Sequence, residues 1–142
     1  MRYFLSLMLL LTVPTVFAQG IYDAAKIKDE LKKDAIAVIR NEEQFFDVKS
    51  LSSGHYTYKV AITILNKAGD ELAEMAEVYD KFSNIYNVKA TLYDASGKKI
   101  RDYKSADIKD QSLVSDFSIF DDNRIKRLKF MSLTYPYTIE YS

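Results

Sequence analysis

The sequence predicts a mainly β fold, an antiparallel sheet or β-sandwich-like half-domain preceded by one short N-terminal helix. Apolar and polar residues alternate over 55–66, 86–93 and 135–142, the period-two pattern of half-buried strands. Segments 66–69 and 94–97 carry Asn or Asp first and Gly fourth, which is typical of turns between strands. The chain has 11 Tyr and 8 Phe, and aromatic residues favour the pleated surface of a sheet.

Composition limits the classes of function. The 142 residues allow one domain at most, and 48% apolar residues are too many for a disordered chain. The 20 basic and 20 acidic residues balance, so no nucleic-acid partner or polybasic membrane patch is expected. Cysteine is absent, which excludes disulfides, thiolate catalysis and Cys-based metal sites within this sequence.

The first segment reads as a secretory signal peptide. Met1-Arg2 is a short basic start, Leu5–Val13 is an apolar run, and Pro14 breaks it. Val16-Phe17-Ala18 has the pattern of a cleavage site, so we expect cleavage after Ala18 and a periplasmic or secreted product. The alternative is a membrane anchor, but the run is short for a bilayer, and no membrane association is expected after cleavage.

A lead-in at 19–34 contains the expected helix, and the β-rich domain is expected over 35–142. Asp23 can cap a helix over Asp23–Lys33, with apolar residues at helical spacing. The β-branched stretch 36–39 either extends this helix or opens a first strand, and we favour the strand. A polar break is expected at 41–43, more strand at 45–48, and a loop at 51–54.

Two similar hairpins are expected next. The first strand, 55–66, turns at Asn66 to Gly69 and returns through 71–83, which we interpret as strand although its spacing also fits a helix. The second begins at 86–93, turns at Asp94 to Gly97, and returns over 98–103. Segments 60–72 and 88–100 align. The similarity reflects either a duplication or the independent use of the same turn residues in two hairpins.

The last third is acidic and then aromatic. Spaced aspartates over 102–122 raise a calcium hypothesis, but the spacing matches no calcium loop, so a solvated connector is expected and no metal or cofactor is predicted. Strands follow over 125–133 and 135–141, with Pro136 at a strand start or on an edge strand. Because the alternation runs unfinished to Ser142, we expect a domain truncated at its C-terminus.

No nucleophile and base pair stands out. His55 is the only histidine, and a lone strand histidine is more often a surface residue than a base. Two alternatives to a non-catalytic module stay open. One is a carboxylate-based hydrolase, since Asp and Glu are plentiful, although no spacing selects a pair. The other is a glycan-binding module in which two groups of tyrosines could stack on sugars, Tyr56 with Tyr58, and Tyr135 with Tyr137 and Tyr141.

The mature chain resembles the N-terminal part of the domain-of-unknown-function family 3857. The residues that carry the resemblance are Ala35–Val38, Ile64–Asn66 with Gly69, Ala90–Gly97, Asp122 with Arg124, Tyr135-Pro136 and Ile139–Tyr141. The likeness covers 22–142. It implies a β-sandwich-like domain of exported bacterial proteins, especially Bacteroidetes, ahead of a transglutaminase-like domain, and it carries over no catalytic residues.

We therefore expect a non-catalytic exported module of structural or binding role. Its expected partner is a downstream transglutaminase-like domain of the same parent chain, with an unidentified protein or glycan as a further ligand. A Cys-His-Asp centre of that neighbour would lie beyond Ser142. The residues of interest within this chain are then structural turn residues, Asn66, Gly69, Asp94 and Gly97, and the aromatic residues named above.

Overall fold

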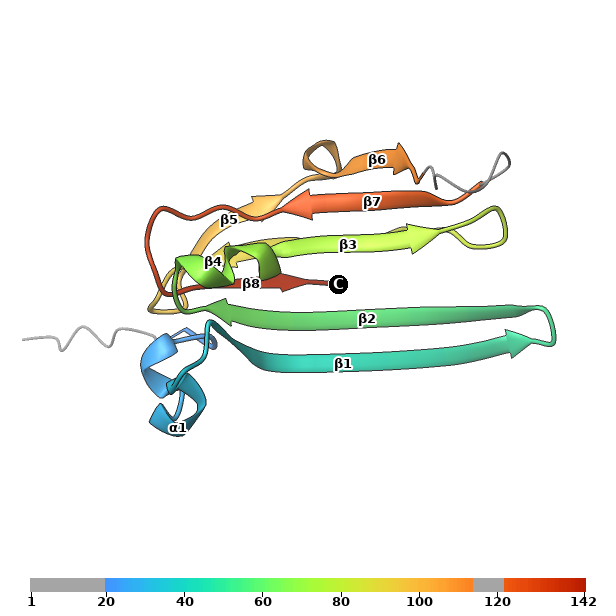
Figure 1. The fold of residues 1–142 in the computed structure, drawn as a ribbon. Helices are drawn as coiled ribbons and strands as arrows, with labels where there is room; N and C mark the ends of the chain where they lie inside the picture. Colours follow the sequence, from blue (N-terminus) through green and yellow to red (C-terminus); the bar gives the residue numbers. More distant parts are fainter. Residues whose placement is uncertain (1–19, 114–121) are drawn as a thin grey trace, which may run out of the picture.

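The fold consists of two antiparallel sheets (Figure 1). A computed structural model describes residues 20–113 and 122–142, so the predicted signal peptide lies outside the described residues. The five-stranded sheet has the order β1-β2-β8-β4-β5, and the three-stranded sheet has the order β3-β7-β6. The strands are β1 (Ala37–Ser50), β2 (Ser53–Ile64), β3 (Glu74–Tyr79), β4 (Ala90–Tyr93), β5 (Lys99–Tyr103), β6 (Lys109–Ser112), β7 (Arg124–Lys129) and β8 (Tyr137–Tyr141). The predicted mainly β class is confirmed.

The expected helix over Asp23–Lys33 is wrong as one element. The chain forms a 3₁₀ turn, η1 (Ala24–Lys26), and one turn of helix, α1 (Asp29–Lys32), separated by extended backbone. Asp23 caps η1 as expected, because its side chain accepts a hydrogen bond from Ala25 N. The interruption falls at Ile27, which has extended backbone and a buried side chain, so packing of this residue competes with a continuous helix.

Strands β1 and β2 form one long hairpin. The strand preferred for 36–39 over a helix extension is confirmed, but the polar break expected at 41–43 is wrong, because β1 runs through it. In place of a break, the strand has a bulge between Ile39 and Asn41, where its register with β2 shifts. Strand β2 matches the expected strand closely.

The first expected hairpin turn is wrong. Asn66 caps the 3₁₀ helix η2 (Lys67–Leu72) by accepting from Ala68 N, and the chain then crosses to the other sheet. Strand β3 is therefore a strand, as preferred, but it pairs with β7 rather than β2. Gly69 lies where a Cβ would come within 2.5 Å of Ile36 O, so close backbone approach explains this glycine.

The second hairpin is confirmed. Strands β4 and β5 pair, with an irregularity next to Tyr93, and Gly97 has a φ of 78° in the turn. Asp94 stabilises that turn by accepting from Ser96 N and Lys98 N. Strand β4 is shorter than expected, because Asn87, with a φ of 57°, interrupts the extended backbone ahead of it. The two aligned segments thus form different structures from similar residues: a capped 3₁₀ helix after β2 and a hairpin turn after β4.

The acidic region is more structured than a connector. It contains η3 (Ser105–Asp107) and β6, and aspartates of this region form ion pairs with Lys and Arg side chains. Asp107 pairs with Arg101 and Asp110 with Arg124, while Asp116 and Asp121 lie outside the described residues. No cluster of metal-ligating side chains occurs within 20–113 or 122–142.

The core lies between the two sheets. Strand β8, the last in sequence, is central in its sheet, and Tyr137, Ile139 and Tyr141 face the interior from it. Met75 and Leu128 meet them from the three-stranded sheet, with Phe130 just past β7. Pro136 stands directly before β8, which confirms the strand-start placement. In the described part of the chain, no helix has the length and apolar character that a membrane span requires.

Candidate functional site

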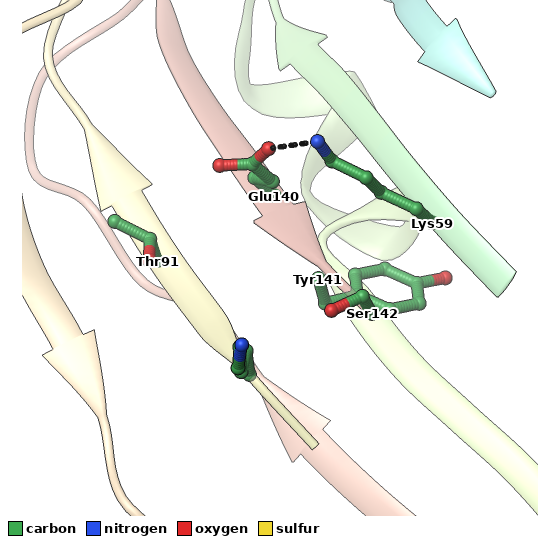
Figure 2. Close-up of a pocket in the computed structure, with 6 residues that line it drawn as sticks. Lys59, Thr91, Glu140, Tyr141 and Ser142 are labelled. Atoms are coloured by element: carbon green, nitrogen blue, oxygen red, sulfur yellow. Dashed lines mark ion pairs between the residues drawn. The ribbon is translucent and has the colours of Figure 1, made fainter. Parts of the chain in front are cut away.

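A carboxylate stands at the centre of the outer face of β8. Glu140 alternates with core residues and so points away from the three-stranded sheet. Tyr22 donates a 2.7 Å hydrogen bond to Oε1, and Tyr93 donates a 2.7 Å hydrogen bond to Oε2. Lys59 Nζ lies 3.3 Å from Oε1, the ion pair that Figure 2 shows. Both carboxylate oxygens are therefore engaged.

Strand pairing brings these side chains together. Glu140 lies directly opposite Thr91 of β4 in the ladder, and Tyr93 reaches it from two residues along that strand. Lys59 comes from β2 on the other flank. Tyr22 comes from the N-terminal segment, which Arg40 holds on this face through hydrogen bonds to Tyr22 O and Asp23 O. The cluster joins three strands and the lead-in segment.

The electrostatics of this cluster favour a fixed charge. Partial burial raises the pKa of Glu140, but hydrogen bonds from Tyr93, Tyr22 and Lys59 outweigh it and hold the pKa below its ordinary value. Burial, together with the hydrogen bond to Glu140, raises the pKa of Tyr93 to about 12 and also raises that of Tyr22. Near neutral pH, Glu140 is therefore ionised, and the hydroxyls of Tyr22 and Tyr93 are protonated.

A hollow of about 360 Å³ opens beside this cluster at the end of β8. Its lining consists of Lys59, Lys89, Thr91, Glu140, Tyr141 and Ser142. The two lysines give it a cationic rim, while Glu140 is already engaged by hydroxyls. The hollow therefore suits a polar or anionic group better than a cation.

The aromatic residues singled out from the sequence do not share one surface. Tyr137 is 1% exposed and Tyr141 is 9% exposed, and both pack between the sheets. Tyr135 keeps 37% of its surface accessible and donates a 2.6 Å hydrogen bond to Asp70 Oδ2. Tyr137 donates to Oδ1 of the same residue at 3.0 Å. Of the three rings, Tyr135 is thus the one with an accessible face, and glycan binding there stays a prediction.

The lone histidine lies on the surface of the long hairpin. His55 Nδ1 and the hydroxyl of Tyr86 lie 2.5 Å apart, and the two rings meet edge to face. This contact ties β2 to the segment that leads into β4. Asp47 lies directly opposite His55 in the ladder, but within the described residues the hydrogen-bond partner of the imidazole is the phenol of Tyr86.

Sequence reasoning missed a group of exposed apolar side chains on the hairpin of β1 and β2. Its members all have exposed side chains and are Phe45, Phe46, Val48, Leu51 and Tyr56. A signal was present: two adjacent phenylalanines break the alternation, so one must face each side of the strand. Glu140 was missed as well, although it stands alone among aromatic and branched residues in its strand.

Comparison with known proteins supports the family resemblance. The model of the family described as a domain of unknown function with a solved structure, DUF3857, matches residues 52–142. The matched region begins near the turn of the long hairpin and includes β2 to β8. No curated protein and no solved structure matched the chain. Since the match covers more than half of the sequence, this chain belongs to the DUF3857 family.

Proposed function

We propose that this chain is a non-catalytic exported module that docks against a neighbouring protein domain through the hairpin of β1 and β2. As partner we propose a transglutaminase-like domain of the same parent polypeptide, as the family resemblance implies. The observation that carries the docking role is the exposed apolar surface of the hairpin.

The hairpin projects beyond the rest of its sheet (Figure 1). Strand β8 pairs with β2 over Val60–Ile64, so in the described structure the remainder of β2 is paired with β1 alone, with a side-chain contact from His55 to Tyr86. A two-stranded ribbon is marginally stable on its own, and large apolar side chains on it gain stability from burial against another surface. The apolar side chains of the projecting half would therefore be stabilised by burial against a partner surface.

Both faces of the ribbon carry apolar side chains. Phe46 lies opposite Tyr56 on one face, and Phe45 lies opposite Thr57 on the other. Phe45 is 64% exposed and Phe46 is 63% exposed. Aromatic residues are enriched in protein interfaces, so each face of the ribbon carries a side chain of the type that such interfaces bury. An ion pair between Asp47 and Lys49 adds mixed charge, which favours a protein surface over a membrane.

The state of the carboxylates supports binding over hydrolysis. A hydrolase of the two-carboxylate type needs one carboxylic acid with a raised pKa near an ionised partner. Burial raises the pKa of Glu77 on β3, which faces the inter-sheet side, whereas Glu140 has a lowered pKa and points to the opposite face. These two groups do not share a cleft.

The test is binding between the purified chain and the proposed transglutaminase-like partner domain, measured by isothermal titration calorimetry. We expect saturable binding that a Phe45→Ser, Phe46→Ser double variant weakens by at least roughly tenfold. A Glu30→Ser variant on the exposed helix α1 is the matched control and keeps full affinity. Turnover of a peptide or glycan by the purified chain, abolished in His55→Ala, would contradict the proposal.

A further inference from the structure

Strand β1 forms one edge of the larger sheet. It runs from Ala37 to Ser50 and pairs with β2 on one side. Within 20–113 and 122–142, no strand pairs with its other side, and the N-terminal segment lies beside its first residues (Figure 1). Edge strands are commonly protected from pairing by short length or by proline, and β1 has neither. Its outer edge is therefore available to another strand.

The hydrogen bonds of the hairpin determine which backbone groups of β1 are free. Leu65 N donates to Ile36 O, so the odd-numbered residues of β2 direct their backbone groups to β1. Past the bulge that follows Ile39, these residues lie opposite the odd-numbered residues of β1 over 41–47. The even-numbered residues over 42–48 consequently direct their N–H and C=O groups to the outer edge.

The side chains of this segment alternate between two faces. The ion pair between Asp47 and Lys49 places both of these side chains on the odd-numbered face. That face carries, in order along the strand, Glu43, Phe45, Asp47 and Lys49, and the even-numbered face carries Gln44, Phe46 and Val48. The odd-numbered face therefore has a carboxylate towards its start and an ammonium group at its end.

We propose that the outer edge of β1 binds the same edge of a second copy of this chain, antiparallel and about a twofold axis at Phe46. In this register Phe46 lies opposite Phe46 of the second copy and exchanges both backbone hydrogen bonds with it. Gln44 then lies opposite Val48 of the second copy. The two larger sheets join into one sheet through a self-complementary interface.

Charge complementarity selects this register. Glu43 lies opposite Lys49 of the second copy, and the twofold axis forms this pair twice. Opposite charges across two strands stabilise the pairing, and like charges weaken it. An axis at Phe45 would set Glu43 against Asp47, and an axis at Asp47 would set this carboxylate against itself.

The length of the overlap excludes a further register. An axis at Val48 would also oppose unlike charges, because Asp47 would face Lys49 of the second copy. Since β1 ends at Ser50, that register pairs only residues 46–50, whereas the axis at Phe46 pairs residues 42–50. The inference goes beyond the proposed docking, because it depends on backbone groups at the edge and not on a partner domain.

Cysteine cross-linking tests the register directly. The chain has no cysteine, so Gln44→Cys and Val48→Cys each introduce a single thiol. We expect air oxidation of an equimolar mixture to give mainly the disulfide between the two different variants, because these positions lie opposite each other. A mixture of Gln44→Cys with Glu30→Cys, on the exposed helix α1, is the control for random collisions. Yields no higher than this control, or self-linking of Val48→Cys alone, overturn the assigned register.

Sedimentation equilibrium of the purified chain tests the charge pairs. We expect a concentration-dependent dimer, and Glu43→Lys or Lys49→Glu should each weaken it about tenfold by opposing like charges. An equimolar mixture of these two variants should restore the dimer, because each charge then meets its opposite. Glu30→Lys makes the same change of net charge away from the edge and is the matched control, with thermal unfolding measured for every variant.

Three outcomes overturn the proposal. The first is a chain that stays monomeric at millimolar concentration. The second is equal dimerisation of Glu43→Lys and Glu30→Lys, or a mixture of the two edge variants that does not restore the dimer. The third is a monomer whose backbone amides over 42–48 shift in nuclear magnetic resonance spectra on addition of the proposed partner domain, which would assign the edge to that domain.

Discussion

The hydroxyl of Tyr22 lies 2.7 Å from Oε1 of Glu140, across 118 positions of sequence. This hydrogen bond ties the N-terminal segment to the central strand of the larger sheet. Arg40 supports the same contact, because its guanidinium donates to Tyr22 O at 3.3 Å and to Thr63 Oγ1 at 3.3 Å. The lead-in segment is thus part of the folded unit and covers the outer face of β8.

Removing this hydrogen bond is expected to cost stability. A Tyr22→Phe variant keeps the ring and leaves Glu140 without one donor, which should lower the free energy of unfolding by about 1–2 kcal/mol. Urea denaturation followed by circular dichroism measures this loss. Tyr135→Phe is the control, because its hydrogen bond to Asp70 is exposed to solvent and Asp70 still accepts from Tyr137, so we expect a smaller loss. Equal losses in both variants would contradict the structural role of Tyr22.

The ionisation of Glu140 makes the free energy of unfolding depend on pH. The pKa of Glu140 lies below its ordinary value of 4.5 in the folded chain, so its contribution is present above that pH. The contribution is lost as the pH falls through the folded-state pKa. We expect Glu140→Gln to flatten the acid limb of a plot of unfolding free energy against pH. A limb of unchanged slope would show that other carboxylates control acid unfolding.

Strand patterns were predictable from the sequence because alternation depends on local geometry. Strand β2 and strand β8 follow the period-two pattern, and both were expected almost to their ends. Pairing was not predictable in the same way. Asn66 to Gly69 has the residues of a hairpin turn, but Asn66 caps η2 instead and sends the chain to the second sheet.

The cluster around Glu140 depends on tertiary contacts. Tyr22, Lys59 and Tyr93 are distant from Glu140 in sequence. The strand order of the larger sheet brings Lys59 and Tyr93 to the carboxylate, and the contacts of Arg40 with the N-terminal segment bring Tyr22. Burial of Ile27, which interrupts the expected helix, likewise depends on packing that no local pattern contains. Residue spacing therefore predicted most of the strands, whereas contacts between distant parts of the chain determined the cluster around Glu140.

The turn between β4 and β5 gives a further prediction. Gly97 has a φ of 78°, and a Cβ there would lie 2.8 Å from Asp23 N, so Gly97→Ala brings both strain and a clash. We expect a loss of about 1–3 kcal/mol in the free energy of unfolding. Gly54→Ala is the control, because its Cβ would meet the end of the exposed Phe46 ring, which can move. A larger loss at Gly54 would contradict the close packing assigned to the turn.

The last prediction compares two phenylalanines with opposite surroundings. Phe130 is 1% exposed and packs against Tyr103 and Tyr141, so Phe130→Ala should lower the free energy of unfolding by about 3–5 kcal/mol. Phe45 is 64% exposed on the hairpin, and Phe45→Ala should change the stability of the isolated chain by less than about 0.5 kcal/mol.

Urea denaturation of the two variants side by side measures this difference. A side chain as large as Phe45 that contributes little to the stability of the isolated chain gains its burial elsewhere, which is the basis of the proposed docking role. A loss at Phe45 comparable to that at Phe130 would show that the hairpin is packed within the chain itself. The exposed aromatic surface would then support the fold and not a contact with a partner.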